Sequence, residues 1–283
     1  MISESYPAPC DHQLSTLPSG AAVHKWSCVS PVAIFILQHG FGEYAERYVS
    51  SHSELIRKLN EKRIDVWAID LWGHGSSPGT RGRVHVEKAV QDHIQLRHQA
   101  AAQGLPVFLF GLSLGGLVTA GSVTQDSSRV DGVILASPAL PVPFSPLGER
   151  AIGLLARILP TVDVPKDRTP IEKLFRDMEQ IRLAEADTLM FRGRMPLLLA
   201  ATALQVGTAM WDKLGEWRTP TLVIHGTSDI AAPCETSKTF VDEIASPEKI
   251  LHLVEGGYHE LLNDLDPDNI VQLILTWLKD RLS

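Results

Sequence analysis

Nearly every residue is apolar in six short runs along this chain: residues 32–37, 64–69, 107–112, 130–136, 221–225 and 250–254. A run that is apolar at every position predicts a strand covered on both faces, as in a parallel sheet. Between the runs, apolar positions spaced along one helix face predict helices at residues 48–61, 87–102, 114–125, 235–245 and 269–282. Strands that alternate with helices indicate an α/β fold with a doubly wound, mostly parallel sheet.

A hairpin precedes the first of these runs. Residues 13–17 and 21–28 flank the turn sequence Pro18-Ser19-Gly20, which predicts two antiparallel strands. Together with the six runs, the hairpin makes a sheet of eight strands, and the helices between them are expected on both faces.

Residues 141–218 break the alternation, because they contain helical patterns and proline-marked turns but no good strand. Ser145-Pro146 predicts the start of a helix that ends at Pro160 and carries one apolar face, formed by Ile152, Leu155, Ile158 and Leu159. Residues 195–211 fit either an ordinary buried helix or part of a cover that shapes a substrate pocket. The position after the sixth strand favours the cover. We expect an α/β core of residues 1–140 and 219–283, with residues 141–218 inserted as a helical cap.

Residues 111–115 read Gly-Leu-Ser-Leu-Gly and fit the pattern G-x-S-x-G. The pattern is short, so its context decides the interpretation. A predicted strand precedes Ser113 and a predicted helix follows it, which is the strand–turn–helix arrangement of a nucleophile elbow. Ser113 is therefore the candidate nucleophile.

A serine hydroxyl needs a base to activate it, and the base needs an acid to orient it. After a nucleophile elbow the acid and then the histidine follow in the chain. Asp229 and His259 come in that order, each in the loop that follows a predicted strand. Open α/β sheets assemble their sites at this edge. Asp70 is a rival acid, but it precedes Ser113 in the chain.

The negative charge that develops on the substrate oxygen needs hydrogen-bond donors. We expect the backbone N–H of Leu114, directly after the nucleophile, to be one of them. The backbone N–H of Phe41, in the loop after the third strand, is expected to be the other.

Composition excludes several other classes of protein. The 283 residues include 26 Lys and Arg against 33 Asp and Glu, and this net charge of −7 argues against a nucleic-acid partner. Three cysteines are an odd number and too few for a disulfide scaffold, which favours a reducing compartment. The N-terminus lacks the basic and apolar regions of a signal peptide, so we expect a soluble, cytoplasmic protein. No histidine or cysteine cluster has zinc spacing and no phosphate-binding motif occurs, so we expect no metal and no cofactor.

Five stretches of the sequence form a combination found in a known group of enzymes. They are His39-Gly40-Phe41-Gly42-Glu43 with Arg47-Tyr48, Asp70-Leu71-Trp72-Gly73-His74-Gly75-Ser76, the elbow of Ser113 with Gly115-Gly116, His225-Gly226 with Asp229, and Tyr258-His259-Glu260. Together they resemble the monoacylglycerol lipase and lysophospholipase branch of the α/β-hydrolases, from about residue 32 to residue 282. The resemblance implies an α/β-hydrolase fold with an apolar cap, and ester hydrolysis through an acyl-enzyme on Ser113. It also implies that Glu43 and Arg47 lie near the leaving alcohol, so both are candidates for substrate binding.

The sequence departs from that branch at several positions. Leu112 and Leu114 stand where histidine and methionine are common beside the serine, and Leu262 replaces a histidine near the glycerol. The cap also lacks a clear match for a tyrosine. A small ester other than a glycerol ester, or a broader carboxylesterase range, therefore stays open. The expected partner is a small ester with an apolar acyl or aryl group, and an exposed apolar cap would allow transient contact with a membrane surface.

Other functions share this scaffold. Hydrolases of carbon–carbon bonds, hydrolases of small peptides, and acyltransferases also use a Ser-His-Asp triad, and the fold does not separate them. Haloalkane dehalogenases and epoxide hydrolases are disfavoured, because their nucleophile is an aspartate. A binding protein on this scaffold would not need all three residues, and their joint presence favours an enzyme.

Overall fold

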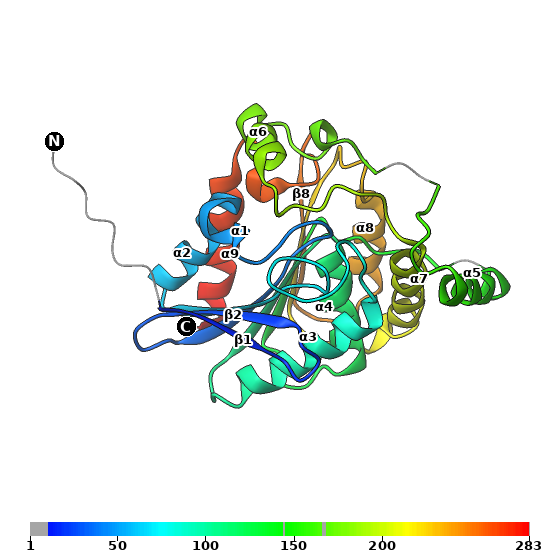
Figure 1. Cartoon of the computed structure of the whole chain (residues 1–283). Coiled ribbons are helices and arrows are strands. Elements are labelled where there is room, and N and C mark those ends of the chain that lie inside the picture. Colours follow the sequence, from blue (N-terminus) through cyan, green and yellow to red (C-terminus); the bar gives the residue numbers. More distant parts are fainter. Residues whose placement is uncertain (1–10, 144, 166–167, 283) are drawn as a thin grey trace.

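Eight strands of the described residues form one sheet, in the order β1-β2-β4-β3-β5-β6-β7-β8 (Figure 1). The structure is a computed structural model that describes residues 11–143, 145–165 and 168–282. β2 pairs antiparallel with β1 and β4, and the other neighbours are parallel. The strands are β1 (Asp11–Thr16), β2 (Ala22–Ser27), β3 (Ala33–Gln38), β4 (Ile64–Ile69), β5 (Val107–Leu112), β6 (Gly132–Ala136), β7 (Thr221–Gly226) and β8 (Lys249–Val254).

The predicted α/β fold with eight mostly parallel strands is confirmed. The N-terminal residues on which the expectation about a signal peptide depends, and Cys10, lie outside the described residues. Several predicted boundaries, including those of β4, β5 and α4 (Leu114–Gln125), coincide with the observed ones.

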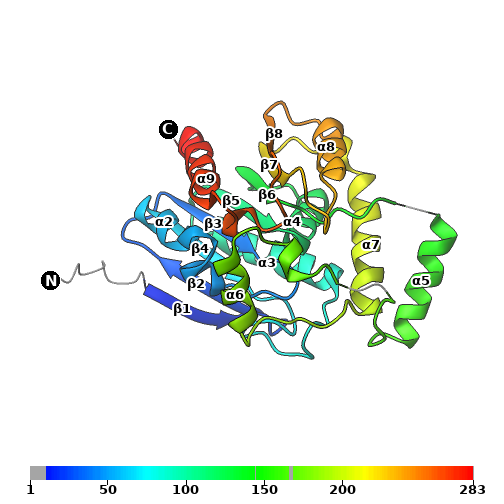
Figure 2. The same ribbon diagram turned by 90° about the horizontal axis from the view of Figure 1, so that it is seen from above.

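Helices cover both faces of the sheet (Figure 2). Successive strand residues point to opposite faces. Phe35 and Leu37 of β3 therefore join one core, and Ile34 and Ile36 join the other. The first core is covered by α1 (Arg47–Ser50), α2 (Leu55–Glu61) and α9 (Pro267–Leu282), and the second by α3 (Val86–Ala101), α4 and α8 (Cys234–Glu243).

The single helix predicted for residues 48–61 is wrong in one respect, because the structure divides it into α1, the 3₁₀ helix η1 (His52–Glu54) and α2. His52, Ser53 and Glu54 all have positive φ angles, of 54°, 51° and 53°. A left-handed conformation costs L residues about 1–2 kcal/mol each and cannot continue a right-handed helix. The predicted helix is therefore interrupted at these three residues.

The prediction that every all-apolar run is covered on both faces is wrong for β8. Ile250 is 46 % exposed and Leu253 is 37 % exposed. β8 lies at the edge of the sheet, next to β7 alone, so its side chains have fewer neighbours than those of the central strands.

The described part of residues 141–218 contains helices and no strand, apart from one isolated bridge between Asp163 and Pro196. α7 packs into the core of the sheet, where Leu199, Val206 and Met210 are buried. The helices are α5 (Pro146–Ile158), η2 (Ile171–Lys173), α6 (Met178–Ala186), α7 (Leu197–Trp211) and η3 (Leu214–Glu216); a further 3₁₀ helix, η4 (Leu261–Asn263), precedes α9.

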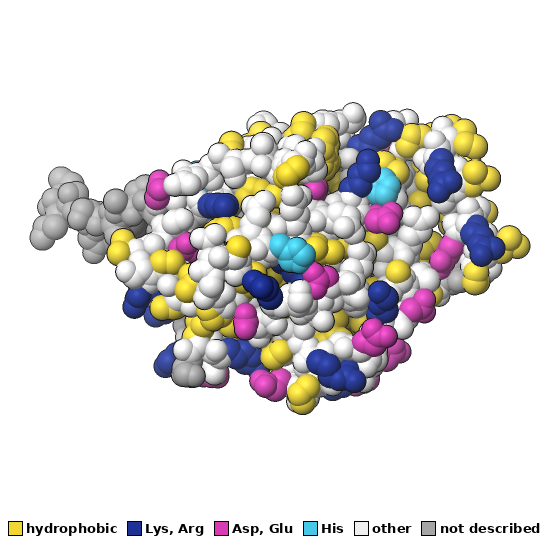
Figure 3. Space-filling view, turned by 90° about the horizontal axis from the view of Figure 1, so that it is seen from below, with side chains coloured by type: hydrophobic (Ala, Val, Ile, Leu, Met, Phe, Trp, Pro, Cys, Tyr) yellow, Lys and Arg dark blue, Asp and Glu magenta, His cyan; other side chains and the backbone are white. Residues whose placement is uncertain are grey.

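α5 begins at Pro146, as predicted, but its apolar residues are not packed on the core. The helix lies against α7 at the outer edge of the molecule (Figures 1 and 2). Leu147 is 77 % exposed and Ile158 is 68 % exposed. Figure 3 shows apolar side chains, together with Lys and Arg, on the lobe at the right where α5 projects.

Within the residues that the structure describes, no helix combines the length and the apolar character that a crossing of the membrane requires.

Candidate active site

Ser113 lies at the turn between β5 and α4, as the G-x-S-x-G pattern predicts. Its φ of 53° and ψ of −118° lie outside the regions that L residues usually occupy. Hydrogen bonds hold this strained turn: Ser113 N–H donates to the Ala136 carbonyl at 3.1 Å, and the Ser113 carbonyl accepts from Gly116 N–H at 2.9 Å and Ala139 N–H at 3.0 Å. Strain of this kind is found at functional sites, where the surrounding structure maintains it.

Glycines allow the turn to pack tightly. A Cβ atom at Gly111 would lie 2.4 Å from the Gly115 carbonyl oxygen, and one at Gly115 would lie 2.1 Å from the Gln38 carbonyl oxygen. Both distances are impossible for a real side chain. Glycine is therefore needed where α4 starts against the ends of β3 and β5.

Asp229 and His259 meet at the carboxyl ends of the neighbouring strands β7 and β8. His259 Nδ1 and Asp229 Oδ2 are 2.6 Å apart. The two loops are joined as well, because Thr227 N–H and Ser228 N–H each donate to a carbonyl of the other loop at 3.0 Å. Since Nδ1 donates to the carboxylate, Nε2 is the nitrogen that can accept a proton. We call Asp229 and His259 the dyad.

Asp229 is a buried carboxylate with several donors. Its Oδ1 accepts from Ala231 N–H at 2.8 Å and Ala232 N–H at 3.0 Å, and His225 Nε2 lies 3.1 Å from its Oδ2. Burial raises the pKa of Asp229, but the hydrogen bonds from His225, His259 and the backbone outweigh it and hold the pKa well below its ordinary value. The acid of the dyad is therefore charged.

His225 lies inside a strand, and the sequence alone predicts only an ordinary structural role for it. In the structure its Nε2 faces Asp229, and its Nδ1 lies 2.7 Å from Ser237 Oγ on α8. The ring thus fixes the acid of the dyad. The sequence carries one signal that would have identified it, the position of His225 four residues before Asp229 at the end of β7.

The charge of Asp229 acts in turn on His259. Burial lowers the pKa of His259, but the hydrogen bond and charge of Asp229, with the charge of Glu260, raise it above the ordinary value. A base of raised pKa binds the proton of a serine hydroxyl more strongly, and it is neutral only at a higher pH.

Ser113 stands apart from the dyad in one respect. Among the described residues, no hydrogen bond joins the Ser113 hydroxyl to the His259 ring. Hydrogen bonds of catalytic groups in free enzymes are often long and tighten only when substrate binds. The contact between Ser113 and His259 stays a prediction.

Two backbone amides next to Ser113 have no acceptor among the described residues, those of Phe41 and Leu114. The Phe41 loop passes close to the elbow, because a Cβ atom at Gly40 would lie 3.3 Å from Ser113 Cβ. Free amides at this place are what an oxyanion hole requires.

Histidines hold the loop of residues 39–42, which we call the oxyanion loop. His74 Nε2 accepts from Gly42 N–H at 3.0 Å, and His39 Nε2 accepts from Leu71 N–H at 3.0 Å. Burial lowers the pKa of His74 to about 3, so this ring is neutral and can accept. His74 therefore has a structural role in holding the oxyanion loop.

Asp70 supports the same region and lies away from the dyad. It accepts from Ala45 N–H at 2.8 Å and from Ser76 N–H at 2.7 Å, and His24 Nε2 lies 3.0 Å from its Oδ2. A carboxylate with these partners orients the chain after the oxyanion loop.

The segment before α7 also fastens the oxyanion loop. Arg168 Nη2 donates to the Phe41 carbonyl at 2.8 Å, and Phe191 N–H donates to the Gly42 carbonyl at 2.9 Å. The Phe41 and Phe191 rings pack edge to face, with centroids 5.6 Å apart. Neither Arg168 nor Phe191 belongs to a motif, so sequence reasoning missed both.

Glu43 and Arg47, the candidates for substrate binding, lie beside the elbow and are both buried. Glu43 Oε1 is 3.8 Å from Arg47 Nη1 and would be 3.9 Å from a Cβ atom at Gly40. Arg47 Nε is also 3.6 Å from Asp187 Oδ2, before α7. The three departures from the lipase pattern, Leu112, Leu114 and Leu262, are all buried apolar side chains.

Two groups of described residues bring histidine and carboxylate donor atoms within 4.8 Å of one another: His12, His24 and Glu46, and Glu43, His52 and Glu260. In the first group, His12 Nε2 and His24 Nδ1 lie 3.0 Å apart, a hydrogen-bond distance. The expectation of no metal stays a prediction.

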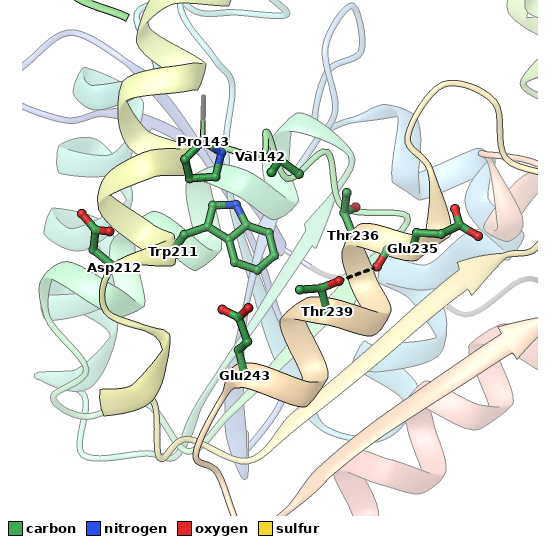
Figure 4. Close-up of a pocket in the computed structure, with 8 residues that line it drawn as sticks. All are labelled: Val142, Pro143, Trp211, Asp212, Glu235, Thr236, Thr239 and Glu243. Carbon is green, nitrogen blue, oxygen red and sulfur yellow. Dashed lines mark hydrogen bonds between the residues drawn. The ribbon is translucent and has the colours of Figure 1, made fainter. Parts of the chain in front are cut away.

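A surface groove of about 480 Å³ lies between the end of α7 and α8 (Figure 4). Trp211 forms its apolar wall, and Asp212, Glu235 and Glu243 surround it. None of the residues that line this groove belongs to the candidate active site.

Comparison with known proteins identifies the family of the chain. The chain matches the Hydrolase_4 family, described as serine aminopeptidase, S33, over residues 29–266. It is 26 % identical over 257 residues to a monoacylglycerol lipase of Mycolicibacterium smegmatis, covering 89 % of this chain and 90 % of that one. It is 27 % identical over 263 residues to the human monoglyceride lipase, covering 89 % of this chain and 84 % of that one.

Solved structures show the same relationship. The crystal structure of the Paleococcus ferrophilus monoacylglycerol lipase superposes with a TM-score of 0.81 at 27 % identity, covering 92 % of this chain and 99 % of that one. The family match spans most of the sequence, and the fold agrees over nearly its whole length. The chain therefore belongs to the Hydrolase_4 family (serine aminopeptidase, S33) and is a monoacylglycerol lipase-like α/β-hydrolase.

Proposed function

We propose that this serine ester hydrolase cleaves acyl esters through an acyl-enzyme on Ser113, with His259 as general base and Asp229 as the acid that orients it. The observation that carries the proposal is the 2.6 Å contact between His259 and Asp229 at the same sheet edge as the strained turn of Ser113. The order of the three residues along the chain supports it too.

The proposed reaction has two halves. Ser113 Oγ attacks the ester carbonyl carbon while His259 Nε2 takes the hydroxyl proton, and the resulting oxyanion binds the N–H groups of Phe41 and Leu114. Collapse of this intermediate breaks the bond to the alcohol, which leaves with the proton from His259. Water then attacks the acyl-enzyme with His259 again as base, and the acid and free Ser113 are released. Side chains, backbone amides and water suffice for every step.

We take monoacylglycerol as the first substrate class, since several similar proteins carry that activity in their names. Glu43 and Arg47 lie beside the elbow and are proposed to face the leaving alcohol. Leu112, Leu114 and Leu262 bring no polar group to this end, so the preference for glycerol over other small alcohols is expected to be weak.

We propose that residues 141–218 act as the cap of this site. The contacts of Arg168 and Phe191 with the oxyanion loop support this role, because they join part of the segment to the loop that carries the Phe41 amide. The odd number of cysteines supports a cytoplasmic location.

The central test uses Ser113→Ala and a soluble p-nitrophenyl ester. We expect turnover to fall at least a thousandfold, because the substitution removes the nucleophile. A fluorophosphonate probe should label the natural protein and fail to label the variant. Full turnover by purified Ser113→Ala protein, with contaminating esterase excluded, would overturn the proposal.

Product analysis separates the alternatives on this scaffold. An ester, a vinylogous diketone, a proline amide and an added alcohol acceptor are compared with one enzyme preparation. If the enzyme turns over the diketone or the amide faster than the ester, or mainly transfers the acyl group to the alcohol, its function is that activity and not ester hydrolysis. Failure of the fluorophosphonate probe to label the folded protein would indicate a binding protein.

We further propose that α5 contacts membrane surfaces through its exposed apolar side chains. Leu155 is 46 % exposed on this helix. Leu155→Asp is expected to reduce flotation with liposomes and to leave hydrolysis of a soluble ester unchanged. Equal flotation of the two proteins would exclude α5 as the contact.

A further inference from the structure

Three buried side chains lie between the oxyanion loop and the loop that carries His259. Glu43 directly follows the oxyanion loop, Glu260 directly follows His259, and His52 comes from η1. His52 Nε2 lies 3.5 Å from Glu43 Oε2 and 3.6 Å from Glu260 Oε2. Their exposed fractions are 3 % for Glu43, 5 % for Glu260 and 0 % for His52. We call Glu43, His52 and Glu260 the clasp.

Unless a proton is shared between its side chains, the clasp leaves buried polar atoms without a hydrogen bond. Glu43 Oε2 and His52 Nε2 are buried atoms with no hydrogen-bond partner. Burial lowers the pKa of His52 to about 3, so its ring is neutral and does not neutralise either glutamate. Two ionised carboxylates at this place would be two buried negative charges side by side, an arrangement that is resolved when one of them keeps its proton.

The surroundings of Glu43 favour its protonated form. Burial and the neighbouring Glu260 raise the pKa of Glu43, although Arg47 acts in the opposite direction. Arg47 is 3.8 Å from Glu43 and also 3.6 Å from Asp187, so it serves two carboxylates. The Tyr48 hydroxyl also faces Glu43, and Asn263 Nδ2 lies 3.5 Å from Glu260 Oε2.

Other titratable groups also face the clasp. The Tyr48 ring stacks on His52 with centroids 3.7 Å apart, and Arg168 interacts electrostatically with both glutamates. His39 acts on His52, and both glutamates act on His259. The protonation of the clasp is therefore coupled to the base of the proposed triad.

We propose that Glu43 is protonated at neutral pH and donates a hydrogen bond to the charged Glu260, and that this pair positions the His259 loop against the oxyanion loop. Glu43 would thus link the oxyanion loop to the loop of His259, the residue proposed to transfer the proton. The inference rests on the proposed function, and it makes Glu260 and His52 positioning residues rather than catalytic ones.

The backbone of η1 is strained to place His52 here. His52, Ser53 and Glu54 all have left-handed φ angles, which are unfavourable for residues other than glycine. His52 N–H donates to Asn263 Oδ1 at 2.6 Å, which ties η1 to η4 just beyond His259. A costly conformation that is held by contacts on both sides is typical of a segment that fixes functional groups.

A divalent cation is the rival occupant, because the donor atoms of the clasp lie within 4.8 Å of one another. The positive charges of Arg47 and Arg168 act on the same glutamates and disfavour a second cation. A proton needs no entry path into the buried cluster, whereas a metal ion does. The proton is therefore the better explanation.

The test compares Glu43→Gln with Glu260→Gln, and uses Glu255→Gln in the same loop as an exposed control. The readout is the acid limb of kcat/KM against pH for a soluble ester, which reports the ionisation of His259. In Glu43→Gln the new amide would donate to the charged Glu260, so the charge beside His259 remains and the limb should not move. In Glu260→Gln the new amide would accept from neutral Glu43, so that charge is lost and the limb should move to lower pH by about 1 unit.

A third variant tests positioning. Glu260→Leu keeps the volume of the side chain but removes the acceptor, so we expect kcat to fall about tenfold or more while Glu260→Gln retains most of it. Thermal unfolding of each variant separates loss of fold from loss of alignment. Equal kcat for Glu260→Leu and Glu260→Gln would overturn the positioning role.

The remaining outcomes are equally decisive. If the acid limb of the pH profile moves in Glu43→Gln but not in Glu260→Gln, the proton lies on Glu260 and the assignment to Glu43 is overturned. If the acid limb moves in both variants, both carboxylates are ionised and the proposal is overturned.

One equivalent of metal in the purified protein, lost in both variants, would establish the cation instead. If natural protein is not labelled by the fluorophosphonate probe, the proposed function has failed before the clasp is tested.

Discussion

The dyad and the clasp are two clusters of histidine and carboxylate that are almost equally buried, yet their acids respond in opposite ways. The pKa of Asp229 lies well below its ordinary value, and the pKa of Glu43 lies above its own. Asp229 accepts from two backbone N–H groups and faces two histidine rings, whereas Glu43 Oε2 has no hydrogen-bond partner. Burial is common to both clusters, so the hydrogen bonds to Asp229 and the carboxylate neighbour of Glu43 decide which carboxyl is charged.

The largest expected effect comes from the charge of the dyad. Asp229→Asn keeps the shape of the side chain but removes the charge that orients and stabilises the protonated His259 ring. We expect kcat to fall about 10⁴-fold, as is typical when the acid of such a triad is replaced by its amide. Asp212→Asn, at an exposed position after α7, is the control, and a loss below tenfold for Asp229→Asn would contradict the role of the dyad.

The second effect concerns the donors of Asp229. His225→Ala removes one hydrogen bond to a charged group, at a cost of about 1.5–3 kcal/mol. If that cost appears in the transition state, kcat falls about 10- to 100-fold, measured on a soluble ester at a pH above the acid limb. His252→Ala, on exposed β8, should change kcat less than twofold. Equal effects of the two substitutions would show that His225 does not support the dyad.

A third prediction compares support of the dyad with support of the oxyanion loop. Arg168→Met removes the hydrogen bond to the Phe41 carbonyl, so the loop should become less ordered and kcat/KM should fall about tenfold. Arg192→Met is the matched control, because among the described residues Arg192 donates to carbonyls of α6 and of the residue after it and not to the oxyanion loop. If both variants retain full activity, the segment before α7 does not hold the oxyanion hole.

The smallest expected effect is on the free energy of unfolding. The contributions of Asp229 and Glu43 to it should change with pH in opposite directions. A depressed pKa means that the contribution of Asp229 is present above about pH 4 and is lost as pH falls toward its folded value. A raised pKa means that the contribution of the Glu43 proton is complete below about pH 4.5 and is lost as pH rises through its folded value.

Urea denaturation at several pH values measures this difference. The free energy of unfolding of natural protein minus that of Asp229→Asn should increase from acid to neutral pH. The same difference for Glu43→Gln should decrease, and each change is expected to be on the order of 1–2 kcal/mol. Parallel curves for the two variants would contradict the assignment of opposite protonation states.

The sequence predicted the framework well because its signals are local. All-apolar runs identified the strands, and the glycines around Ser113 identified the elbow, since both patterns follow from the immediate neighbours of each residue. The exceptions have local causes as well. β8 is apolar but lies at an edge, which the run itself does not reveal, and η1 depends on three left-handed residues without a glycine among them.

The supports of the candidate site could not be predicted, because they depend on contacts between distant segments. His52 meets Glu260 across more than two hundred residues, and Arg168 meets Phe41 across more than a hundred. Pairing of this kind leaves no periodicity or spacing in the sequence. His225 is the exception, since it precedes Asp229 by only four residues and lies on the strand that leads to it.

The hydrogen bonds of Arg168 and Phe191 to the carbonyls of Phe41 and Gly42 have one further consequence. The segment proposed as the cap and the loop proposed to supply an amide to the oxyanion are fastened together, so we expect a movement of one to move the other. If the proposed cap opens to admit a lipid, its movement would then disturb the proposed oxyanion hole. Admission and turnover would alternate, and the acyl group would meet full catalytic power only after the entrance has closed behind it.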